Sequence, residues 1–229
     1  MSRADELAEN LAALEQRIAA ACATAGRARD DVVLVAVTKT HPVSDVALLR
    51  DLGVRDVGEN RDQEARDKAA AVPDVRWHFV GGLQTNKARS VASYADVVHS
   101  VDRAALVDAL SAGAQRAQRE LDVLLQVSLD GDPARGGALP ADVPALAEQV
   151  AAAPALRLAG VMAVAPLDAD PAAAFAALAQ VSARLRADHP YATVVSAGMS
   201  GDLEQAIAAG ATHVRVGTAL LGRRPPAIR

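Results

Sequence analysis

The sequence predicts an α/β protein of a single domain, a (β/α)8 barrel with an extra helix at its N-terminus. Short apolar runs alternate with helix-like segments along the 229-residue chain, which is typical of parallel strands joined by helical crossovers. There are eight such runs, and eight strand–helix units fill about 200 residues. We therefore expect one domain over residues 1–229. A doubly wound open sheet fits less well, because no G-x-G-x-x-G motif follows the first strand.

The extra helix is expected at residues 3–25, before the first strand. Apolar residues recur there at steps of three and four, forming one stripe of an amphipathic helix: Leu7, Leu11, Leu14, Ile18 and Cys22. Gly26 ends this helix. Cys22 is the single cysteine of the chain, so it cannot form an internal disulfide, and we interpret it as a small core residue.

The first strand is expected at residues 32–39, a mostly β-branched run typical of a strand buried on both faces. The following strands are expected at 55–58, 75–81, 96–100, 122–129, 156–163, 193–196 and 213–217. A helix with Ser44 as its N-cap follows the first strand and ends at Gly53. The remaining helices are expected at 62–71, 85–93, 103–119, 141–152, 171–188 and 202–209.

Composition and charge exclude several classes of protein. The net charge is −4 with both signs interspersed, so the chain has no basic stripe for nucleic acid or anionic lipid. The N-terminal residues MSRADELAEN lack the apolar core of a signal peptide, and no apolar run approaches the roughly 20 residues of a membrane span. We therefore expect a cytoplasmic protein that binds neither nucleic acid nor membranes.

Functional groups of a (β/α)8 barrel lie at the carboxyl ends of the strands, and the first expected strand ends at Lys39. The chain has only three lysines, Lys39, Lys68 and Lys87, and uses arginine as its usual surface cation. A lysine that projects into the mouth of the barrel is partly desolvated, which lowers its pKa and allows the neutral amine to condense with an aldehyde. The alternative is that Lys39 only caps the strand and reaches water.

The loops after the seventh and eighth strands are the usual phosphate position of this fold. In SAGMSGD, at 196–202, small residues let backbone N–H groups approach an anion. Ser200 offers a hydroxyl there, and a helix starting near Gly201 directs its positive end to the same place. Gly217 and Thr218 offer a second amide and hydroxyl. Either loop alone could be an ordinary glycine turn, but the two together, opposite a strand-end lysine, favour a phosphate site.

Arg215 alternates with Val214 and Val216 on the eighth strand, so its permanent charge needs a partner. One interpretation is an ion pair that closes the barrel. The other is a donor to a ring nitrogen of the pyridine type, and a fixed cation there would keep that nitrogen unprotonated. An unprotonated pyridine is a weak electron sink, which argues against carbanion chemistry.

Other polar residues near strand ends have less specific interpretations. Asn60, in the sequence GEN, is a candidate for a polar contact with a bound cofactor, and Glu59 beside it could instead hold the strand end in place. A strand histidine such as His78 is usually structural, and no second histidine stands at metal spacing. We assign no catalytic residue and no metal ligand, because no Ser-His-Asp set, paired carboxylate or zinc motif is recognisable.

Several motifs occur in order between residues 35 and 222. They are VAVTKTHP, DVGENRDQEARDKA, WHFVGGLQTNK, GVMAVAP and SAGMSGDLEQAIAAGATHVRVGTALLG. Together they resemble the pyridoxal phosphate homeostasis protein family, which is related to the barrel domain of alanine racemase. Ordered motifs over most of a chain are far more specific than one short motif. The sequence departs mildly from the family pattern at Thr38, Gly82 and Ala197.

The resemblance implies a fold-type III barrel that holds pyridoxal 5′-phosphate (PLP) as a Schiff base on Lys39. It implies the following cofactor-binding residues: Lys39, Asn60, Met199, Ser200, Arg215, Gly217 and Thr218. Among them, Ser200, Gly217 and Thr218 would hold the phosphate, and Arg215 would face the pyridine nitrogen. The implied role, without established catalysis, is to bind PLP, limit its free concentration and deliver it to apo-enzymes that depend on it.

The alternatives to a carrier are enzymes. An amino-acid racemase needs acid–base groups on both faces of the substrate carbon, and related racemases take one of them from a second domain of a partner chain. We expect no such domain here, and Tyr94 and Tyr191 lie away from the functional strand ends. Slow racemisation or transamination stays open, because an exposed Schiff base exchanges with amino acids. A lysine aldolase without a cofactor would leave Arg215 unexplained. For the oligomeric state, a monomer and a weak dimer are both open.

Overall fold

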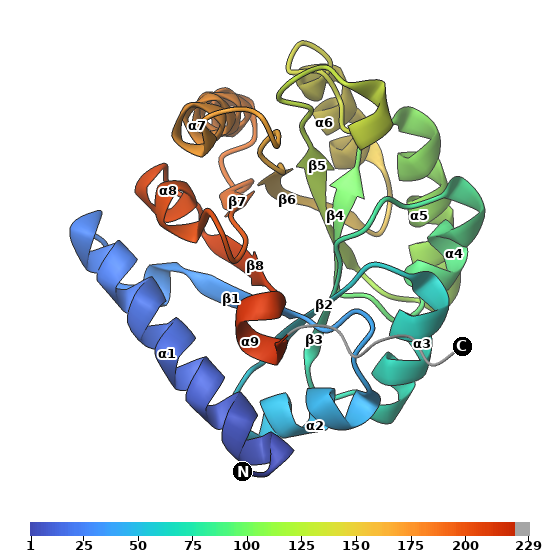
Figure 1. The fold of residues 1–229 in the computed structure, drawn as a ribbon. Helices are drawn as coiled ribbons and strands as arrows, with labels where there is room; N and C mark the ends of the chain where they lie inside the picture. The colour runs from blue at the N-terminus through green and yellow to red at the C-terminus, as the bar shows by residue number, and fades with distance from the viewer. Residues whose placement is uncertain (223–229) are drawn as a thin grey trace.

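The structure is a computed structural model that describes residues 1–222, so residues 223–229 of the expected domain lie outside it. Its strands form a closed parallel barrel in chain order, in which β8 pairs with β1 (Figure 1). The strands are β1 (Val33–Val37), β2 (Asp56–Glu59), β3 (Arg76–Phe79), β4 (Val97–Val101), β5 (Leu121–Gln126), β6 (Leu156–Met162), β7 (Val194–Ser196) and β8 (His213–Val216). The predicted barrel is confirmed, while a single domain over 1–229 stays a prediction.

Helices surround the strands on the outside of the barrel (Figure 1). They are α1 (Arg3–Thr24), α2 (Val43–Asp51), α3 (Asp62–Ala71), α4 (Ala88–Val91), α5 (Ala104–Ala117), α6 (Val143–Ala152), α7 (Pro171–Asp188), α8 (Leu203–Ala208) and α9 (Thr218–Leu221). Three short 3-10 turns connect elements: η1 (Arg29–Asp31), η2 (Thr85–Lys87) and η3 (Pro133–Arg135). Within residues 1–222, no helix combines the length and the apolar character that crossing a bilayer would need.

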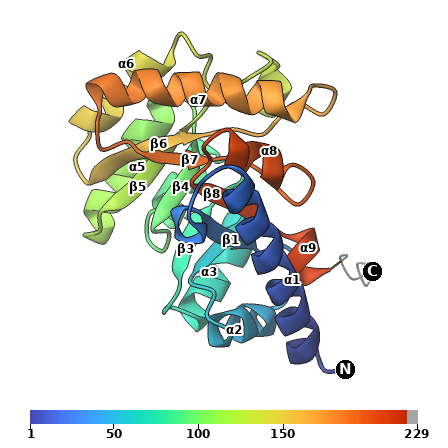
Figure 2. The same ribbon diagram turned by 90° about the vertical axis from the view of Figure 1, so that its left-hand side faces the viewer.

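The extra N-terminal helix α1 packs where the first and last strands meet. Figure 2 shows it beside α8 and α9. The predicted apolar stripe faces this contact: Leu7, Leu14, Ile18 and Cys22 are buried in one cluster with residues of α8, α9, β1 and β8. The buried Cys22 supports its interpretation as a core residue. The helix therefore covers the side of the barrel that carries the two loops predicted to hold phosphate.

Side chains on the strands alternate between the surrounding helices and the barrel interior, as the two-residue period of a strand requires. On β8, Val214 and Val216 pack in the cluster beneath α1, so Arg215 between them faces the interior. On β3, Trp77 packs on the helix side, and His78 points inward. The interior of the barrel thus holds several buried polar side chains, where barrels of this fold usually hold branched apolar ones.

Some element boundaries differ from the sequence prediction. Helix α2 begins at Val43 with Pro42 at its N-cap, so the prediction of Ser44 as the cap was wrong. Pro42 has the extended backbone of an N-cap, with φ −69° and ψ 159°, so the helix begins at the next residue. The expected helix at 85–93 is a 3-10 turn followed by the single-turn helix α4. Helix α9 was not predicted, because four residues after a strand are too few to show a helical period.

Candidate functional site

A cavity of about 370 Å³ opens at the carboxyl end of the barrel. Its volume lies in the range of small-molecule sites, about 300–1,000 Å³. All seven residues predicted to bind the cofactor line it: Lys39, Asn60, Met199, Ser200, Arg215, Gly217 and Thr218. Four small or apolar residues complete the wall: Val37, Val80, Val164 and Gly201. The candidate residues, far apart in the sequence, therefore share one cavity.

Lys39 lies just beyond the end of β1 and is half-buried. The strand ends at Val37, two residues earlier than predicted. The chain turns sharply after Lys39, because Thr40 has a left-handed backbone with φ 68°. The main-chain N–H of Thr40 donates to Glu64 Oε1 over 2.7 Å, which holds the turn against α3. The amine is thus presented from a short, fixed turn at the rim.

Beneath this turn lies a buried set of polar residues, which we name the Lys68 cluster: Lys68, Glu59, Glu64 and Thr38. Lys68 Nζ donates to Thr38 O at 2.8 Å and to Glu59 Oε1 and Glu64 Oε1, each at 2.7 Å. Thr38 Oγ1 donates to Glu59 Oε1 at 2.6 Å. Burial raises the pKa of Glu59, although the hydrogen bonds from Lys68 and Thr38 oppose that rise. Glu59 thus holds the end of the strand, which was one of its two interpretations.

The loop after β7 is braced by its own backbone. Gly198 has φ +88°, and a Cβ at this position would lie 2.6 Å from Ala206 Cβ on α8. The N–H of Met199 donates to Asp202 Oδ1 at 2.6 Å. Helix α8 begins at Leu203, two residues after the predicted start near Gly201. The loop is therefore a fixed rim element with small residues facing the cavity.

The two loops predicted to hold phosphate are joined to each other. The N–H of Ala219, at the start of α9, donates to Ser200 Oγ over 3.4 Å. From outside, Arg17 on α1 donates from Nη1 to the carbonyl oxygen of Ser200 at 2.8 Å and forms an ion pair with Glu204. The sequence prediction missed Arg17, because nothing in its local pattern distinguishes it from other arginines on the polar face of α1.

Arg215 lies at the floor of the cavity and is only 5% exposed. Its Nη1 donates to Ser196 Oγ at 2.7 Å, and its Nη2 donates to Ala163 O at 2.9 Å. No carboxylate pairs with Arg215 within residues 1–222, so the predicted alternative of an ion pair closing the barrel does not hold for this part of the chain. Burial lowers the pKa of Arg215 to about 10, and the charge of Asp202 opposes this. The group is still a cation at neutral pH.

Asn60 brings an unsatisfied polar atom to the cavity wall. Its Oδ1 is buried and has no hydrogen-bond partner in the described part of the chain. The backbone of Asn60 packs tightly against the neighbouring rim, because a Cβ at Gly81 would lie 2.5 Å from the carbonyl oxygen of Asn60. A buried acceptor without a partner costs about 1–3 kcal/mol. A ligand with a hydrogen-bond donor would remove that cost.

A row of hydrogen bonds runs through the barrel interior below Arg215. It includes His78, whose role the sequence left open, and His99, which the sequence prediction missed. His78 Nδ1 lies 2.8 Å from His99 Nε2, and His99 Nδ1 lies 3.0 Å from Ser196 Oγ. At the other end, His78 Nε2 lies 2.9 Å from Asp56 Oδ1. Among the described residues, no three metal-ligating side chains converge to hold an ion; the two histidines are joined to each other.

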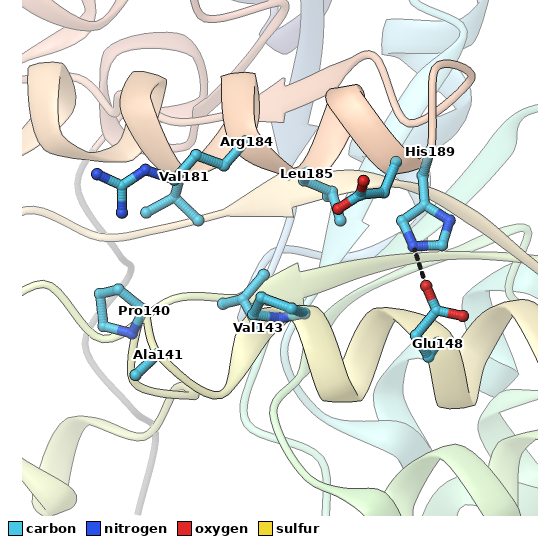
Figure 3. Close-up of a pocket in the computed structure, with 10 residues that line it drawn as sticks. Pro140, Ala141, Val143, Glu148, Val181, Arg184, Leu185 and His189 are labelled. Carbon is cyan, nitrogen blue, oxygen red and sulfur yellow. Dashed lines mark ion pairs between the residues drawn. The ribbon is translucent and has the colours of Figure 1, made fainter.

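A second hollow lies on the outer surface, between α6 and α7 (Figure 3). Its volume is about 230 Å³, and its walls include Val143, Val181 and Leu185. His189 Nε2 and Glu148 Oε1 form an ion pair of 3.2 Å across one end. None of the predicted site residues lines this groove, and none of the buried polar atoms without a partner among the described residues belongs to its walls. The cavity at the barrel mouth is therefore the candidate site.

Comparison with known sequences identifies full-length relatives. The family model for the N-terminal domain of alanine racemase matches residues 9–225. A pyridoxal phosphate homeostasis protein of Mycobacterium bovis is 45% identical, over 97% of this chain and 94% of its own. The pyridoxal phosphate homeostasis protein of Escherichia coli K12 is 37% identical, over 96% of this chain and 97% of its own.

Comparison with solved structures agrees with the fold. PipY of Synechococcus elongatus PCC7942, solved with PLP bound, has a TM-score of 0.82 and 37% identity, covering 94% of this chain and all of that one. Alanine racemase of Corynebacterium glutamicum has a TM-score of 0.73 at 16% identity. That match covers 99% of this chain but 62% of the racemase. At such low identity it shows only that the barrel is shared.

Proposed function

Since this chain belongs to the family of pyridoxal phosphate homeostasis proteins, we propose that it binds PLP and controls the supply of the free cofactor in the cell. The observation that carries this proposal is one cavity that gathers an amine, two anion-suited loops and a buried guanidinium. These three groups match the aldehyde, the phosphate and the ring nitrogen of PLP. The PLP-bound structure of the similar PipY supports the same ligand.

In this proposal each end of PLP meets a different part of the cavity. Lys39 would hold PLP through its amine, since an amine condenses reversibly with an aldehyde with release of one water. The hydroxyls of Ser200 and Thr218 and the main-chain N–H of Gly217 hold the phosphate. Val37 limits the space there, because a Cβ at Gly217 would lie 3.2 Å from Val37 O. A small residue at 217 therefore fits an anion held close to the backbone.

In this proposal the remaining three residues, Arg215, Asn60 and Met199, contact the pyridine ring of PLP. Arg215 uses two of its N–H groups within the protein, and a guanidinium carries five, so donors are left for the ring nitrogen. Because the cation itself does not give up its proton, the ring nitrogen stays unprotonated and is a weak electron sink. Asn60 and Met199 lie beside the ring, and the unsatisfied Oδ1 of Asn60 accepts a hydrogen bond from the bound molecule or its water.

A carrier fits this cavity better than an amino-acid racemase does. A racemase would need acid–base groups on both sides of the substrate carbon. Neither tyrosine lines the cavity: Tyr94 is packed behind the strands, and Tyr191 lies on the wall of a separate hollow with Arg76 and Arg157, near the amino ends of the strands. Burial raises the pKa of Tyr94, which makes it a poor proton donor or acceptor near neutral pH.

We further propose a cytoplasmic location, a monomer or weak dimer, and transfer of PLP to apo-enzymes that depend on it. Transfer requires a reversible bond, and a Schiff base is broken by water or by another amine. The half-buried position of Lys39 leaves room for such an attack. A simple check is whether the loaded protein restores activity to a PLP-dependent apo-enzyme faster than free PLP at the same concentration of unbound cofactor.

The proposal is tested by adding PLP to the purified protein, recording its visible absorption, reducing with borohydride and mapping the peptides by mass. We expect a coloured protein with the added mass on the Lys39 peptide. Lys39→Ala should lose both signals, whereas Lys87→Ala, a change at an exposed lysine outside the cavity, should keep both. A colourless wild type, or label on Lys68 or Lys87 instead, would overturn the binding proposal. Rapid racemisation of an amino acid would overturn only the carrier role.

A further inference from the structure

The two buried histidines of the barrel interior belong to one continuous row of hydrogen bonds, which we name the interior chain: Arg215, Ser196, His99, His78 and Asp56. It crosses the barrel from β8 to β7, β4, β3 and β2, with successive distances of 2.7, 3.0, 2.8 and 2.9 Å. The first four residues are at most 5% exposed. The chain therefore connects the floor of the candidate PLP cavity with the opposite end of the barrel.

The direction of every hydrogen bond in this chain follows from its two ends when each ring carries one proton. Arginine can only donate and a carboxylate can only accept, so Ser196 Oγ accepts from Arg215. The hydroxyl proton of Ser196 then points to His99 Nδ1, and His99 must carry its own proton on Nε2. By the same argument His99 donates to His78 Nδ1, and His78 donates from Nε2 to Asp56. With one proton on each ring, every proton in the row has one acceptor.

Charged and titratable groups on three strands lie around the two rings. Arg76 on β3 and His213 and Arg215 on β8 act electrostatically on His99, and Asp56 on β2 is hydrogen-bonded to His78. Burial lowers the pKa of His99 well below its usual value, and the nearby charge of Arg215 adds to that effect. Burial raises the pKa of Asp56, but its hydrogen bond with His78 and the nearby positive charges outweigh that effect, so the carboxylate is ionised.

We propose that His78, His99 and Ser196 are positioning residues that align a row of dipoles between the Asp56 carboxylate and the Arg215 guanidinium, and so hold Arg215 charged and oriented toward the cavity. This inference rests on the proposed PLP site, because the group that Arg215 serves is the ring nitrogen. Aligned hydrogen bonds polarise one another in a low-dielectric interior. The interior chain thus stabilises and orients the charged Arg215, as a directly contacting carboxylate would, without placing a negative charge beside the cofactor.

A purely structural role explains the chain less well. The opposite part of the interior is filled by an apolar cluster of Val97, Leu124 and Met162, which is the usual filling of such barrels. Apolar residues at 78 and 99 would avoid the cost of burying imidazole rings. The buried polar side chains of the interior chain continue without a break from Arg215 to Asp56.

The sharpest variant is Ser196→Ala, which removes one oxygen and disconnects Arg215 from His99. Its matched control is Ser100→Ala, because Ser100 is equally buried, lies on β4, does not line the cavity and has no partner for its Oγ within the described residues. The readouts are the dissociation constant for PLP and the pH titration of the visible band of the bound cofactor. Losing a hydrogen bond to a charged group weakens binding about 10-fold or more.

We expect Ser196→Ala to raise the dissociation constant about 10-fold and to shift the pH titration, and Ser100→Ala to match the wild type in both. His99→Leu should reproduce the Ser196→Ala effect. Asp56→Asn still accepts a hydrogen bond through its amide oxygen. Its dissociation constant and pH titration should therefore stay closer to those of the wild type than the values for Asp56→Leu. If Ser196→Ala binds and titrates like the wild type, the proposed role of the chain is wrong, although PLP binding still stands.

A second measurement is independent of the cofactor. Nitrogen NMR of the histidine rings in the PLP-free protein should find both His78 and His99 protonated on Nε2 and bare on Nδ1 at neutral pH. Ser196→Ala should perturb Nδ1 of His99, and Ser100→Ala should not. Rings in the opposite tautomer would overturn the inference, even if the wild type binds PLP. If the wild type does not bind PLP, the proposed function fails, and this measurement alone decides whether the chain exists.

Discussion

Arg17 on the N-terminal helix donates a hydrogen bond to the carbonyl oxygen of Ser200, 183 residues further along the chain. The same guanidinium forms an ion pair with Glu204. One side chain of α1 therefore binds both the loop after β7 and the helix that follows it. Because Ser200 is a candidate phosphate ligand, α1 supports the rim of the cavity without touching a ligand there.

Replacing Arg17 by Met should weaken PLP binding with little loss of fold stability. We expect a dissociation constant raised about 3- to 10-fold, since a loop held less firmly must be ordered when the phosphate binds. The ion pair lies near the surface and contributes at most about 1 kcal/mol to the free energy of unfolding. Titration with PLP and urea unfolding measure the two effects.

Arg29→Met is the matched control for this prediction. Arg29 forms a similar ion pair with Glu15 of α1, at 2.7 Å, but lies away from the cavity. It should lower stability by a similar small amount and leave PLP affinity unchanged. Equal affinity for the Arg17 variant and the wild type would show that the rim needs no support from α1.

The Lys68 cluster predicts a large loss of stability when its central amine is removed. Lys68→Met would leave the buried Glu59 carboxylate, only 1% exposed in its side chain, without its charged partner. Breaking one side of a buried ion pair costs about 3–5 kcal/mol. Urea unfolding at pH 7 measures this change, and Lys87→Met, at an exposed lysine, should cost almost nothing.

A double variant separates the charge from the shape of this cluster. Lys68→Met combined with Glu59→Gln removes both charges and should recover part of the lost stability. No recovery would mean that packing around the Lys68 side chain, and not the unpaired carboxylate, accounts for the loss.

The barrel and its alternation could be predicted from the sequence, because eight apolar runs separated by amphipathic segments leave few other arrangements. The rim residues Lys39, Ser200 and Gly217 were predictable for a related reason: in this fold any residue just after a strand reaches the same end of the barrel. Periodicity alone was enough to locate them. It was not enough to find the N-cap of α2, which is Pro42, two residues before the predicted Ser44.

The interior chain and Arg17 could not be predicted in the same way. His99 and Ser196 lie 97 residues apart and meet only because β4 and β7 face each other across the closed barrel. Which polar side chains touch inside the barrel depends on the stagger of all the strands. Short sequence patterns carry no information on this stagger. A strand histidine taken alone is ordinary, and only its contacts make it informative.

Stability should fall as the pH drops below neutral, because a buried histidine resists protonation. Burial is the largest cause that lowers the pKa of His213, from 6.5 to about 4. Below pH 6.5 the unfolded chain takes up a proton that the folded chain refuses, so the unfolded state is favoured progressively down to about pH 4. The contribution is at most about 3 kcal/mol, and is present in full above pH 6.5.

His213→Asn tests this dependence. The shorter amide still reaches the position of Nδ1, which bonds to Thr212 Oγ1 at 2.9 Å, but it does not titrate. Urea unfolding at several values between pH 4.5 and 7.5 should show a flatter profile than the wild type. An unchanged slope in His213→Asn would assign the acid sensitivity to other groups.

Gly198 predicts a strict requirement for glycine in the loop after β7. Any other residue there would have to adopt φ +88° and would bring its Cβ within 2.6 Å of Ala206 Cβ. Gly198→Ala should therefore lower the free energy of unfolding by about 2 kcal/mol or more and displace Met199 and Ser200, weakening PLP binding as well. Gly82→Ala is the control, because that rim glycine has an ordinary φ and open space around its Cβ position. Thermal unfolding and PLP titration of both variants decide the point, and a Gly198→Ala protein that equals Gly82→Ala in both would mean that α8 can move away to admit the methyl group.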